Sequence, residues 1–455
     1  MTNPAVITSD ISIYRRYNTM IRQVFFGPLI QTNDKEELII KESVAVFVDN
    51  GKITRILENS KDYEKDFKFE WKIRDEIKIL SHGQFMMPGF IDAHTHAVQF
   101  PNLGLGYNKC LLDWLEIYTF PLEKKYSDTE FAERVFEAVV KRTIKMGTTT
   151  ACYFASLYAD ACTILAKKTA ELGQRAFIGK VNMNIPRDDG YCESTLTSVV
   201  DTIGFIKSIE IIGNPLVKPI ITPRFALSCD MELMQKLAEI AKTKDVHIQS
   251  HVSENKDEII AVKQAFPHLP SYTAVYDAAG LLTNKTVLAH GVYLEDSELA
   301  ILKERGTAVI HCPSSNTNLK SGLCDVQRLK ANGIKVGLGT DASGAASYSM
   351  LNEMRSVLQV SNCLSLTRDN YTPLSYKDVF HMATLGSAKA LAIDDKVGNL
   401  MIGKEFDALI VDMNVEGSLL DNFKEYTLEE NFQRFIYAGD ERNIVSVYIK
   451  GKQVK

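Results

Sequence analysis

The chain has 455 residues, of which 45% are hydrophobic and 24% charged, with a formal net charge of −5. These values are ordinary for a globular protein, and the interspersed charges give no sign of a surface for nucleic acid or anionic membrane. No apolar run approaches the about 18 residues of a membrane-spanning helix. The first 20 residues, with Arg15 and Arg16 in their middle, lack the apolar core of a signal peptide.

The eight cysteines are scattered along the chain and form no Cys-x-x-Cys pair. This distribution is typical of reduced thiols and not of a disulfide framework or of a structural zinc site with cysteine ligands. We therefore expect a cytoplasmic protein.

The first 88 residues are predicted to form a small β domain. Short runs of alternating polar and apolar residues indicate strands at residues 21–26, 38–48, 52–57 and 71–80. Asn50-Gly51 lies between two of these runs and is typical of a hairpin turn. Pro88-Gly89 then marks the end of this pattern.

After Pro88, apolar runs alternate with stretches of helical periodicity, which is typical of βα units and a parallel sheet. Strands are expected at residues 90–94, 149–154, 175–182, 217–225, 247–251, 286–290, 308–312 and 335–341. Helices are expected at residues 129–146, 159–172, 231–243 and 257–266, among others. This α/β pattern predicts a (β/α)8 TIM-like barrel over residues 89–396.

A long loop is expected within the barrel at residues 99–125, and loops of this length often form lids or pocket walls. Its Trp114 and Tyr118, four residues apart, are interpreted as packing residues and not as a surface for stacking a substrate.

The tail, residues 397–455, returns to short strands at 408–411 and 444–449, with a turn at Lys450-Gly451-Lys452. We expect it to complete the N-terminal domain. The small domain would then be a discontinuous β-sandwich built from both ends of the chain.

Four histidines and one aspartate fall at the ends of predicted strands. His94 and His96 are two residues apart and therefore project the same way, whereas His251, His290 and Asp341 end three later strands. Each has a plainer explanation when taken alone: a turn residue, a buried structural histidine or a helix N-cap. Because the carboxyl ends of barrel strands converge on one face, the five together predict a metal site with imidazole and carboxylate ligands.

Glu254 follows His251 by three residues, and a short turn would return it over the metal. A carboxylate that does not bind the ion is suited to proton transfer there. The alternative role is an acid in the first turn of the next helix. The other zinc deaminase signature, His-x-Glu with Pro-Cys-x-x-Cys, is absent from the sequence, so any deamination must use the barrel site.

Residues 87–96, MPGFIDAHTH, resemble the opening of the amidohydrolase superfamily, and residues 398–408 resemble its closing segment. Within that superfamily, the chain resembles the family of guanine deaminases over most of residues 85–454. The resemblance is carried by residues 112–121, 148–155, 173–177, 222–229, 247–255, 311–316 and 338–341.

This resemblance implies hydrolysis of guanine to xanthine and ammonia in purine catabolism, by a homodimer with one zinc ion per chain. The implied zinc ligands are His94, His96, His251 and Asp341. Glu254 would act as the proton shuttle, while His290 and Asp341 would hold the attacking water. The ligand types also suit iron(II), so zinc is favoured and not fixed.

The resemblance also implies a guanine pocket formed by Gln99, Arg224 and Phe225. These residue types suit a purine, because an aromatic ring stacks on its face and amide or guanidinium groups reach the acceptors of its edge. The alternative for Arg224 and Phe225 is an ion pair at a strand end beside a core aromatic residue.

Two other functions remain open at this stage. One is a related barrel hydrolase that deaminates another aminated ring, such as a pterin, a triazine or an adenine-type base. The other is a non-catalytic scaffold, although all expected ligands are present.

A second metal ion would need a carboxylated lysine at the end of the fourth barrel strand. That end reads Thr222-Pro223-Arg224-Phe225, and Lys218 lies at the strand start. Lys180, on the third strand, would matter only if the strand count were wrong. The sequence therefore favours a single metal ion.

Overall fold

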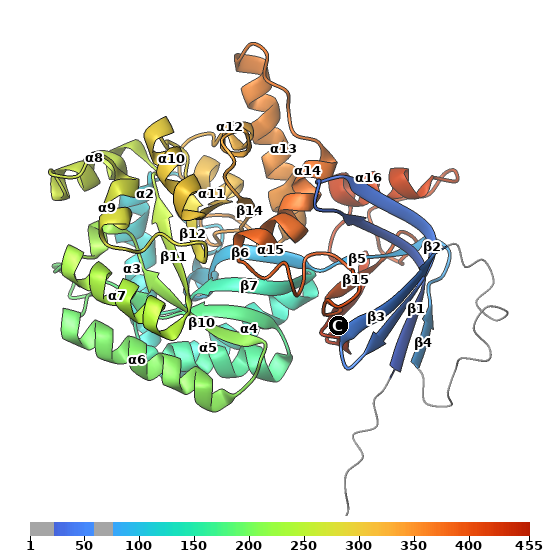
Figure 1. Ribbon diagram of the computed structural model, residues 1–455, viewed down its shortest axis with the longest axis horizontal. Coiled ribbons are helices and arrows are strands. Elements are labelled where there is room, and N and C mark those ends of the chain that lie inside the picture. Colours follow the sequence, from blue (N-terminus) through green and yellow to red (C-terminus); the bar gives the residue numbers. More distant parts are fainter. Residues whose placement is uncertain (1–21, 59–75) are drawn as a thin grey trace, which may run out of the picture.

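The computed structural model describes residues 22–58 and 76–455, and the predictions for residues 1–21 and 71–75 lie outside these ranges. A helix-covered barrel lies beside a twisted β-sheet (Figure 1). The blue start and the red end of the chain both belong to the sheet side, while the middle of the chain forms the barrel.

The barrel strands are parallel neighbours in chain order, as predicted, and short β9 pairs with β10. They are β6 (Phe90–His96), β7 (Thr148–Phe154), β8 (Arg175–Gly179), β9 (Val181–Asn182), β10 (Val217–Pro223), β11 (His247–Val252), β12 (Thr286–His290), β13 (Ala308–His311) and β14 (Val336–Leu338). Backbone hydrogen bonds then join the segment after β14 to β6: Asp341 N donates to His94 O at 2.9 Å, and His96 N donates to Ala342 O at 3.1 Å. These bonds bring the first and last strands together and close the barrel.

Gly339 permits this closure. A Cβ atom at Gly339 would lie 2.8 Å from both Cβ and the carbonyl oxygen of His94, which is too close for any other residue. The small residue therefore sets the distance between the segment that carries Asp341 and the strand that carries His94.

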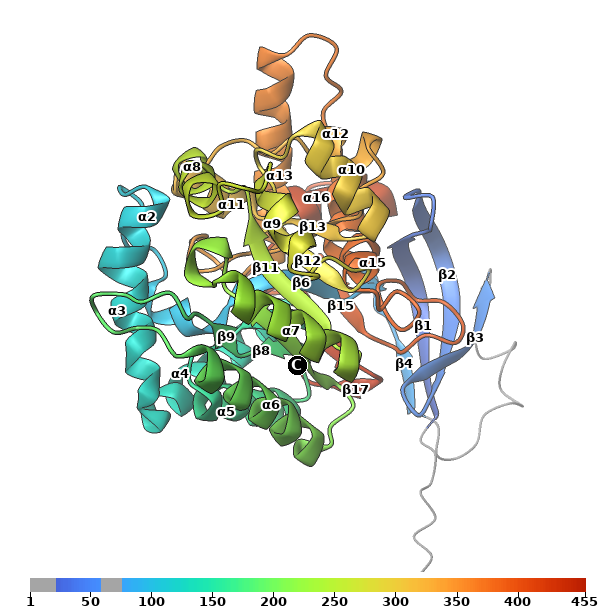
Figure 2. The same ribbon diagram turned by 60° about the vertical axis from the view of Figure 1, so that its left-hand side comes forward.

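Helices cover the outside of the barrel (Figure 2). They are α4 (Thr129–Lys145), α5 (Ala159–Leu172), α6 (Thr195–Ile212), α7 (Met231–Lys244), α8 (Lys256–Ala265), α9 (Tyr272–Ala278), α10 (Asp296–Arg305), α11 (Pro313–Asn318), α12 (Val326–Ala331), α13 (Met350–Thr367), α14 (Tyr376–His381), the π-helical η5 (Met382–Gly386) and α15 (Ser387–Ala390). The four helices predicted by residue range are confirmed as α4, α5, α7 and α8, with ends that differ by at most one residue.

The expected loop at residues 99–125 is largely helical, so that prediction was wrong in secondary structure. It contains η1 (Ala97–Asn102), α2 (Leu111–Trp114), π-helical η2 (Leu115–Thr119), α3 (Phe120–Glu123) and η3 (Lys124–Ser127). Leu111, Trp114 and Leu115 are buried at the spacing of one helix face, and this short apolar stripe was the overlooked signal.

Three of the predicted barrel strands are interrupted or end two or more residues early. The strand expected at 175–182 is interrupted at Lys180, whose ammonium group pairs with Glu193 and with the carbonyl of Val181. Strand β10 stops at Pro223, and β14 stops three residues before Asp341. The side chains expected at these strand ends therefore project from the short segments that follow.

The small domain is discontinuous, as predicted. Where a β-sandwich was expected, its strands all belong to one hydrogen-bonded sheet. The strands are β1 (Arg22–Thr32), β2 (Leu38–Asp49), β3 (Lys52–Glu58), β4 (Glu76–Ile79), β5 (Gln84–Pro88), β15 (Ala408–Asp412), β16 (Ile444–Ile449) and β17 (Lys452–Gln453). Antiparallel pairing of β5 with β15 joins the two ends of the chain. Helix α16 (Leu428–Ala438) lies between β15 and β16 in sequence.

Both predicted hairpin turns of this domain are present. Asn50 and Gly51 have φ angles of +50° and +77°, and Lys450 and Gly451 have +48° and +74°. Positive φ at both central residues is the signature of the tight turn that matches the twist of a hairpin.

The barrel and the small domain are joined by a buried ion pair. Arg175 at the start of β8 donates to both carboxylate oxygens of Asp407 at 3.0 Å and to Glu405 at 2.6 Å. Because Glu405 and Asp407 precede β15, this contact fixes the tail against the barrel floor.

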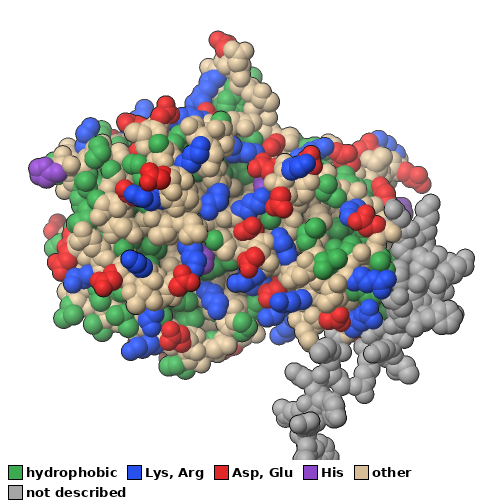
Figure 3. Space-filling model, in the orientation of Figure 1, with side chains coloured by type: hydrophobic (Ala, Val, Ile, Leu, Met, Phe, Trp, Pro, Cys, Tyr) green, Lys and Arg blue, Asp and Glu red, His purple; other side chains and the backbone are tan. Residues whose placement is uncertain are grey.

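Surface charge, cysteines and helix polarity are the features that composition concerned. Basic and acidic side chains are mixed over the face drawn in Figure 3. All eight cysteines are free thiols, five of them buried. Among residues 22–58 and 76–455, no helix is long and apolar enough to cross a membrane.

Candidate metal and substrate site

The histidines and the aspartate predicted at strand ends converge on one point at the carboxyl face of the barrel. Asp341 Oδ1 lies 3.1 Å from His94 Nε2 and 3.0 Å from His96 Nε2, and His96 Nε2 lies 3.2 Å from His251 Nε2. His290 Nε2 is 3.8 Å from Asp341 Oδ2. Ligand atoms of His94, His251, His290 and Asp341 all lie within 4.8 Å of one another.

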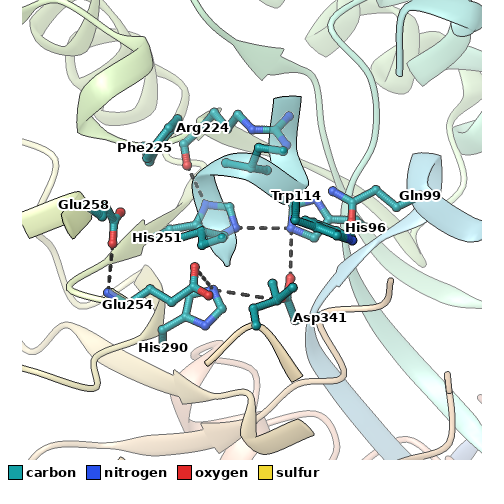
Figure 4. Close-up of a pocket in the computed structure, with 13 residues that line it drawn as sticks. His96, Gln99, Trp114, Arg224, Phe225, His251, Glu254, Glu258, His290 and Asp341 are labelled. Atoms are coloured by element: carbon teal, nitrogen blue, oxygen red, sulfur yellow. Dashed lines mark hydrogen bonds and ion pairs between the residues drawn. The ribbon is translucent and has the colours of Figure 1, made fainter. Parts of the chain in front are cut away.

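The donor set of this cluster fits a divalent metal ion. His251 Nδ1 lies 2.6 Å from the carbonyl oxygen of Arg224, which can only accept, so Nδ1 carries the proton. The lone pair of His251 Nε2 therefore points into the cluster, toward His96 (Figure 4). Burial lowers the pKa of His251 well below its usual value, so the ring is neutral and able to bind a metal.

The carboxylate of Asp341 stays ionised in spite of its burial. Burial alone would raise its pKa, but hydrogen bonds with His94 and His96 outweigh that effect and hold the pKa well below its usual range. Asp341 was also considered as a helix N-cap, but the next helix, α13, begins only at Met350. That alternative is therefore wrong.

The backbone turns sharply where these side chains project. His290 has a φ angle of +77° and Asp341 of +47°, and Ser253, just after β11, also has +47°. Non-glycine residues rarely adopt this conformation, and such strain concentrates at functional sites.

Glu254 faces the cluster but is not one of the residues in hydrogen-bond contact with Asp341. Its Oε2 lies 3.4 Å from His290 Nε2, and its Oε1 accepts a hydrogen bond from Ser321 Oγ at 2.8 Å. Burial raises the pKa of Glu254 to about 7, against the lowering effect of His290. A carboxyl group with this pKa can both accept and deliver a proton near neutral pH.

The alternative role considered for Glu254, an acid in the first turn of the next helix, belongs to a different residue. Helix α8 begins after the N-cap Asn255, and Glu258 completes the capping box. Glu258 Oε2 also accepts from the backbone N–H of Glu254 at 3.0 Å, while Tyr272 donates to its Oε1 at 2.8 Å. Glu258 lines the cavity and was not predicted; its position three residues after an Asn cap was the available signal.

Asn316 is a second residue that the sequence analysis did not single out. Its Oδ1 lies 2.8 Å from His290 Nδ1, which fixes the proton on Nδ1 and turns Nε2 toward Glu254 and Asp341. Its backbone carbonyl accepts from the N–H of Ser321, the residue that donates to Glu254. Asn316 lies within residues 311–316, one of the segments that carried the family resemblance, and this was the available signal.

A cavity opens beside the cluster, between the predicted metal and substrate residues. Gln99, Arg224 and Trp114 lie on one side in the view of Figure 4, with Glu254, His290 and Asp341 on the other. The cavity is lined by His96, Gln99, Leu111, Trp114, Leu115, Arg224, Phe225, His251, Glu254, Glu258, His290, Leu319 and Asp341. The helical segment at residues 97–127 therefore forms a pocket wall, as predicted for the long loop.

Arg224 lines the cavity and also forms the ion pair that the sequence left open as its alternative role. Its guanidinium group pairs with the buried Glu123, with Nη1–Oε2 at 2.6 Å and Nη2–Oε1 at 3.1 Å. Glu123 also accepts from Gln99 Nε2 at 3.1 Å. Glu123 was not predicted, because nothing in the sequence links it to Arg224, 101 residues later.

The two lysines considered for a second metal ion lie elsewhere. Lys180 is buried against Glu193, and Lys218 is exposed at the start of β10. Neither lines the cavity beside the histidine–aspartate cluster.

Comparison with known proteins places this geometry in a family. Residues 85–454 match the model of the Amidohydrolase family. The chain is 46% identical over 422 residues to a Mus musculus protein named guanine deaminase, covering 91% of this chain and 92% of that protein. It is 42% identical over 443 residues to a Dictyostelium discoideum protein of the same name, covering 96% and 98%.

A solved structure of similar fold is the guanine deaminase from C. acetobutylicum, described with guanine bound in its active site. It superposes with a TM-score of 0.88 at 34% sequence identity, covering 95% of this chain and 100% of that one. These matches extend over nearly the whole chain, and the closed barrel and the strand-end cluster agree with them. The chain belongs to the amidohydrolase family, within the group that includes these guanine deaminases.

Proposed function

We propose that this protein is a metal-dependent guanine deaminase that converts guanine and water to xanthine and ammonia. The observation that carries the proposal is the cavity itself. One side presents hydrogen-bonding groups suited to a purine edge, and the other presents the histidine–aspartate cluster and a buried glutamate. The similarity to the Mus musculus and C. acetobutylicum guanine deaminases supports the same substrate.

The metal would be held by His94, His96, His251 and Asp341, because these side chains share the 3.0–3.2 Å contacts of the cluster. We propose one zinc ion per chain, in keeping with imidazole and carboxylate ligands. When bound, such an ion lowers the pKa of water to about 7 and so supplies a nucleophile at neutral pH. His290 and Asp341 would orient the attacking water.

Glu254 would move the protons of the reaction. Its carboxylate takes a proton from the attacking water and delivers it to the ring nitrogen next to C2, which makes C2 more electrophilic. The pKa of about 7 suits both transfers, because neither direction is strongly uphill. The oxygen of the attacking water would bond to C2, and its second proton would pass through Glu254 to the amino group. The C2–N bond then breaks, ammonia leaves, and the oxygen stays on C2 as the new carbonyl of xanthine.

Gln99, Arg224 and Phe225 would bind the base. Arg224 and the amide of Gln99 offer N–H donors for the ring nitrogen and carbonyl acceptors of guanine, and the ring of Phe225 offers a flat apolar face. Holding the base in this way would place C2 between the metal site and Glu254.

Further properties are proposed from the resemblance and from composition. The chain would act in purine catabolism in the cytoplasm, as a homodimer. The eight free thiols are in keeping with a reducing compartment. We also propose domain boundaries at residues 88/89 and 396/397, where the small sheet passes into the barrel and back.

Ammonia release from a panel of aminated rings tests the function. Guanine should be deaminated with a kcat/KM far above that of adenine, a pterin or an aminotriazine, and a chelator should abolish the reaction. A purified, metal-loaded protein that releases no ammonia from guanine, or that prefers another ring, would overturn the proposed substrate.

A further inference from the structure

Glu123 is a buried carboxylate that stands behind the base-binding side of the cavity. It ends helix α3 and is only 1% exposed. Gln99 and Arg224 line the cavity, whereas Glu123 does not. Any effect of Glu123 on a bound base must therefore act through these two neighbours.

The carboxylate has no hydrogen-bonding capacity to spare. Its Oε1 accepts from Gln99 Nε2 and Arg224 Nη2, both at 3.1 Å. Its Oε2 accepts from Arg224 Nη1 at 2.6 Å and from Tyr191 OH at 3.1 Å. A carboxylate offers about four lone-pair sites, so all are filled. Burial alone would raise the pKa of Glu123, but the Arg224 guanidinium outweighs burial, lowers this pKa and keeps the group ionised.

This contact sets the orientation of the Gln99 amide. Its Nε2 faces the carboxylate, and its Oε1 accepts from the backbone N–H of Ser343 at 3.3 Å. The reversed amide would place an oxygen against a negative charge, so it is excluded. One N–H of Gln99 and the outer N–H groups of Arg224 remain for a ligand.

The pair also removes the net charge from this side of the cavity. Arg224 is buried and always protonated, and Glu123 offsets its charge through two parallel hydrogen bonds. The other titratable groups near the pair are His96, a proposed metal ligand, and Arg187, which is itself paired with Glu116 at 2.7 Å. Burial raises the pKa of Tyr191 well above its usual value, so Tyr191 stays neutral.

We propose that Glu123 is a positioning residue that makes this side of the cavity selective for neutral purines over purine anions. The inference rests on the proposed function. Xanthine, with two ring carbonyls, loses an N–H proton more readily than guanine does. A neutral donor surface binds guanine through hydrogen bonds but gives the xanthine anion no charge attraction, which favours release of the product.

Calorimetric binding of xanthine, below and above the pKa of xanthine, tests this selectivity in the metal-loaded protein. In the wild type, affinity should stay level or fall as xanthine becomes an anion. In Glu123→Gln, the unpaired Arg224 should make affinity rise by about tenfold over the same range. Tyr191→Phe is the matched control: it removes one hydrogen bond to Glu123 but leaves both charges, so it should follow the wild type.

The steady-state kinetics of guanine deamination provide a second test. Glu123→Gln should raise KM for guanine more than it lowers kcat, because Gln99 and Arg224 lose their fixed geometry while Glu254 is untouched. A Glu123→Gln protein with the wild-type dependence of xanthine binding on pH would overturn the inference. If that variant does not fold, a wild type that binds the xanthine anion more tightly than neutral xanthine would overturn it equally.

Ammonia release by the wild type, measured in parallel, separates the two proposals. A wild type that does not deaminate guanine defeats the proposed function, whereas the calorimetric comparison still decides the role of Glu123.

Discussion

The proton transfer proposed for this site would depend on how a few side chains are held. Glu254 and His290 face each other at 3.4 Å, and each has a fixed second contact, to Ser321 and Asn316 respectively. Burial would lower the pKa of His290, but Glu254 and Asp341 outweigh it and raise that pKa. One proton between Nε2 and Oε2 therefore satisfies both groups and is available for transfer.

Glu254→Gln should abolish most turnover without loss of metal. The amide keeps the shape of the side chain but cannot accept the proton, so kcat should fall by about 10²- to 10⁴-fold. Metal analysis of the same preparation should give the wild-type content. Glu258→Gln is the control, because it changes a neighbouring buried carboxyl that is engaged in the helix cap. Retained activity in Glu254→Gln would remove Glu254 from the mechanism.

Asn316→Ala should slow catalysis through His290. The ring would lose the acceptor that fixes its tautomer, and kcat should fall by about 10- to 100-fold, with metal content nearly unchanged. Thr317→Ala, on the same helix but exposed, is the control and should behave as the wild type. Equal effects of the two substitutions would mean that Asn316 only stabilises the helix.

At the scale of elements, the site is assembled where the last strand meets the first. The segment from Gly339 to Ala342 bonds to β6 at the carbonyl of His94 and at the N–H of His96, and thereby brings Asp341 against both histidines. The segment that closes the barrel is thus the same segment that brings Asp341 into the candidate metal cluster.

Gly339→Ala should weaken metal binding more than it weakens the fold. The new Cβ would meet His94 at 2.8 Å, so the backbone must shift, at a stability cost of about 1–3 kcal/mol. Metal titration and chemical denaturation measure the two effects. Gly204→Ala, in α6 with open space around its Cβ, is the control and should stabilise the protein by about 0.5–1 kcal/mol. Unchanged metal affinity in Gly339→Ala would contradict this reading.

The elements also explain what the sequence could predict. Apolar runs located the barrel strands, and because strand ends share one face, the positions of His94, His251 and Asp341 predicted a single cluster. Glu123 escaped prediction because its role depends on a side-chain contact with Arg224 that no spacing in the sequence encodes. Glu258 was missed although its position three residues after Asn255 is the spacing of a capping box. The helical segment between residues 97 and 127 was missed because it changes between 3-10, α and π geometry every four to six residues, which leaves only the short apolar stripe of Leu111, Trp114 and Leu115 as a signal.

At the scale of the whole molecule, the small sheet and the barrel are held together by buried charges. Arg175 of the barrel contacts Asp407 and Glu405 of the tail, and Asp407 also accepts from the backbone N–H of Lys450 at 2.8 Å. These contacts therefore hold the tail against the end of the barrel opposite the candidate metal site.

Arg175→Met should destabilise the protein by about 3–5 kcal/mol, because it leaves a buried carboxylate without its partner. Chemical denaturation would measure the loss. Arg305→Met is the control, since Arg305 also bonds to both oxygens of an aspartate, Asp277, but on the surface. Its effect should be much smaller, and equal losses in the two variants would show that the buried contact has no special role.

The central claim is that guanine deamination depends on one metal ion bound at the strand-end cluster. The most direct measurement removes the metal with a chelator and then returns zinc while ammonia release from guanine is followed. Activity should vanish on removal and recover in proportion to zinc, reaching its maximum at one ion per chain. Full activity in the metal-free protein, or a requirement for two ions per chain, would contradict it.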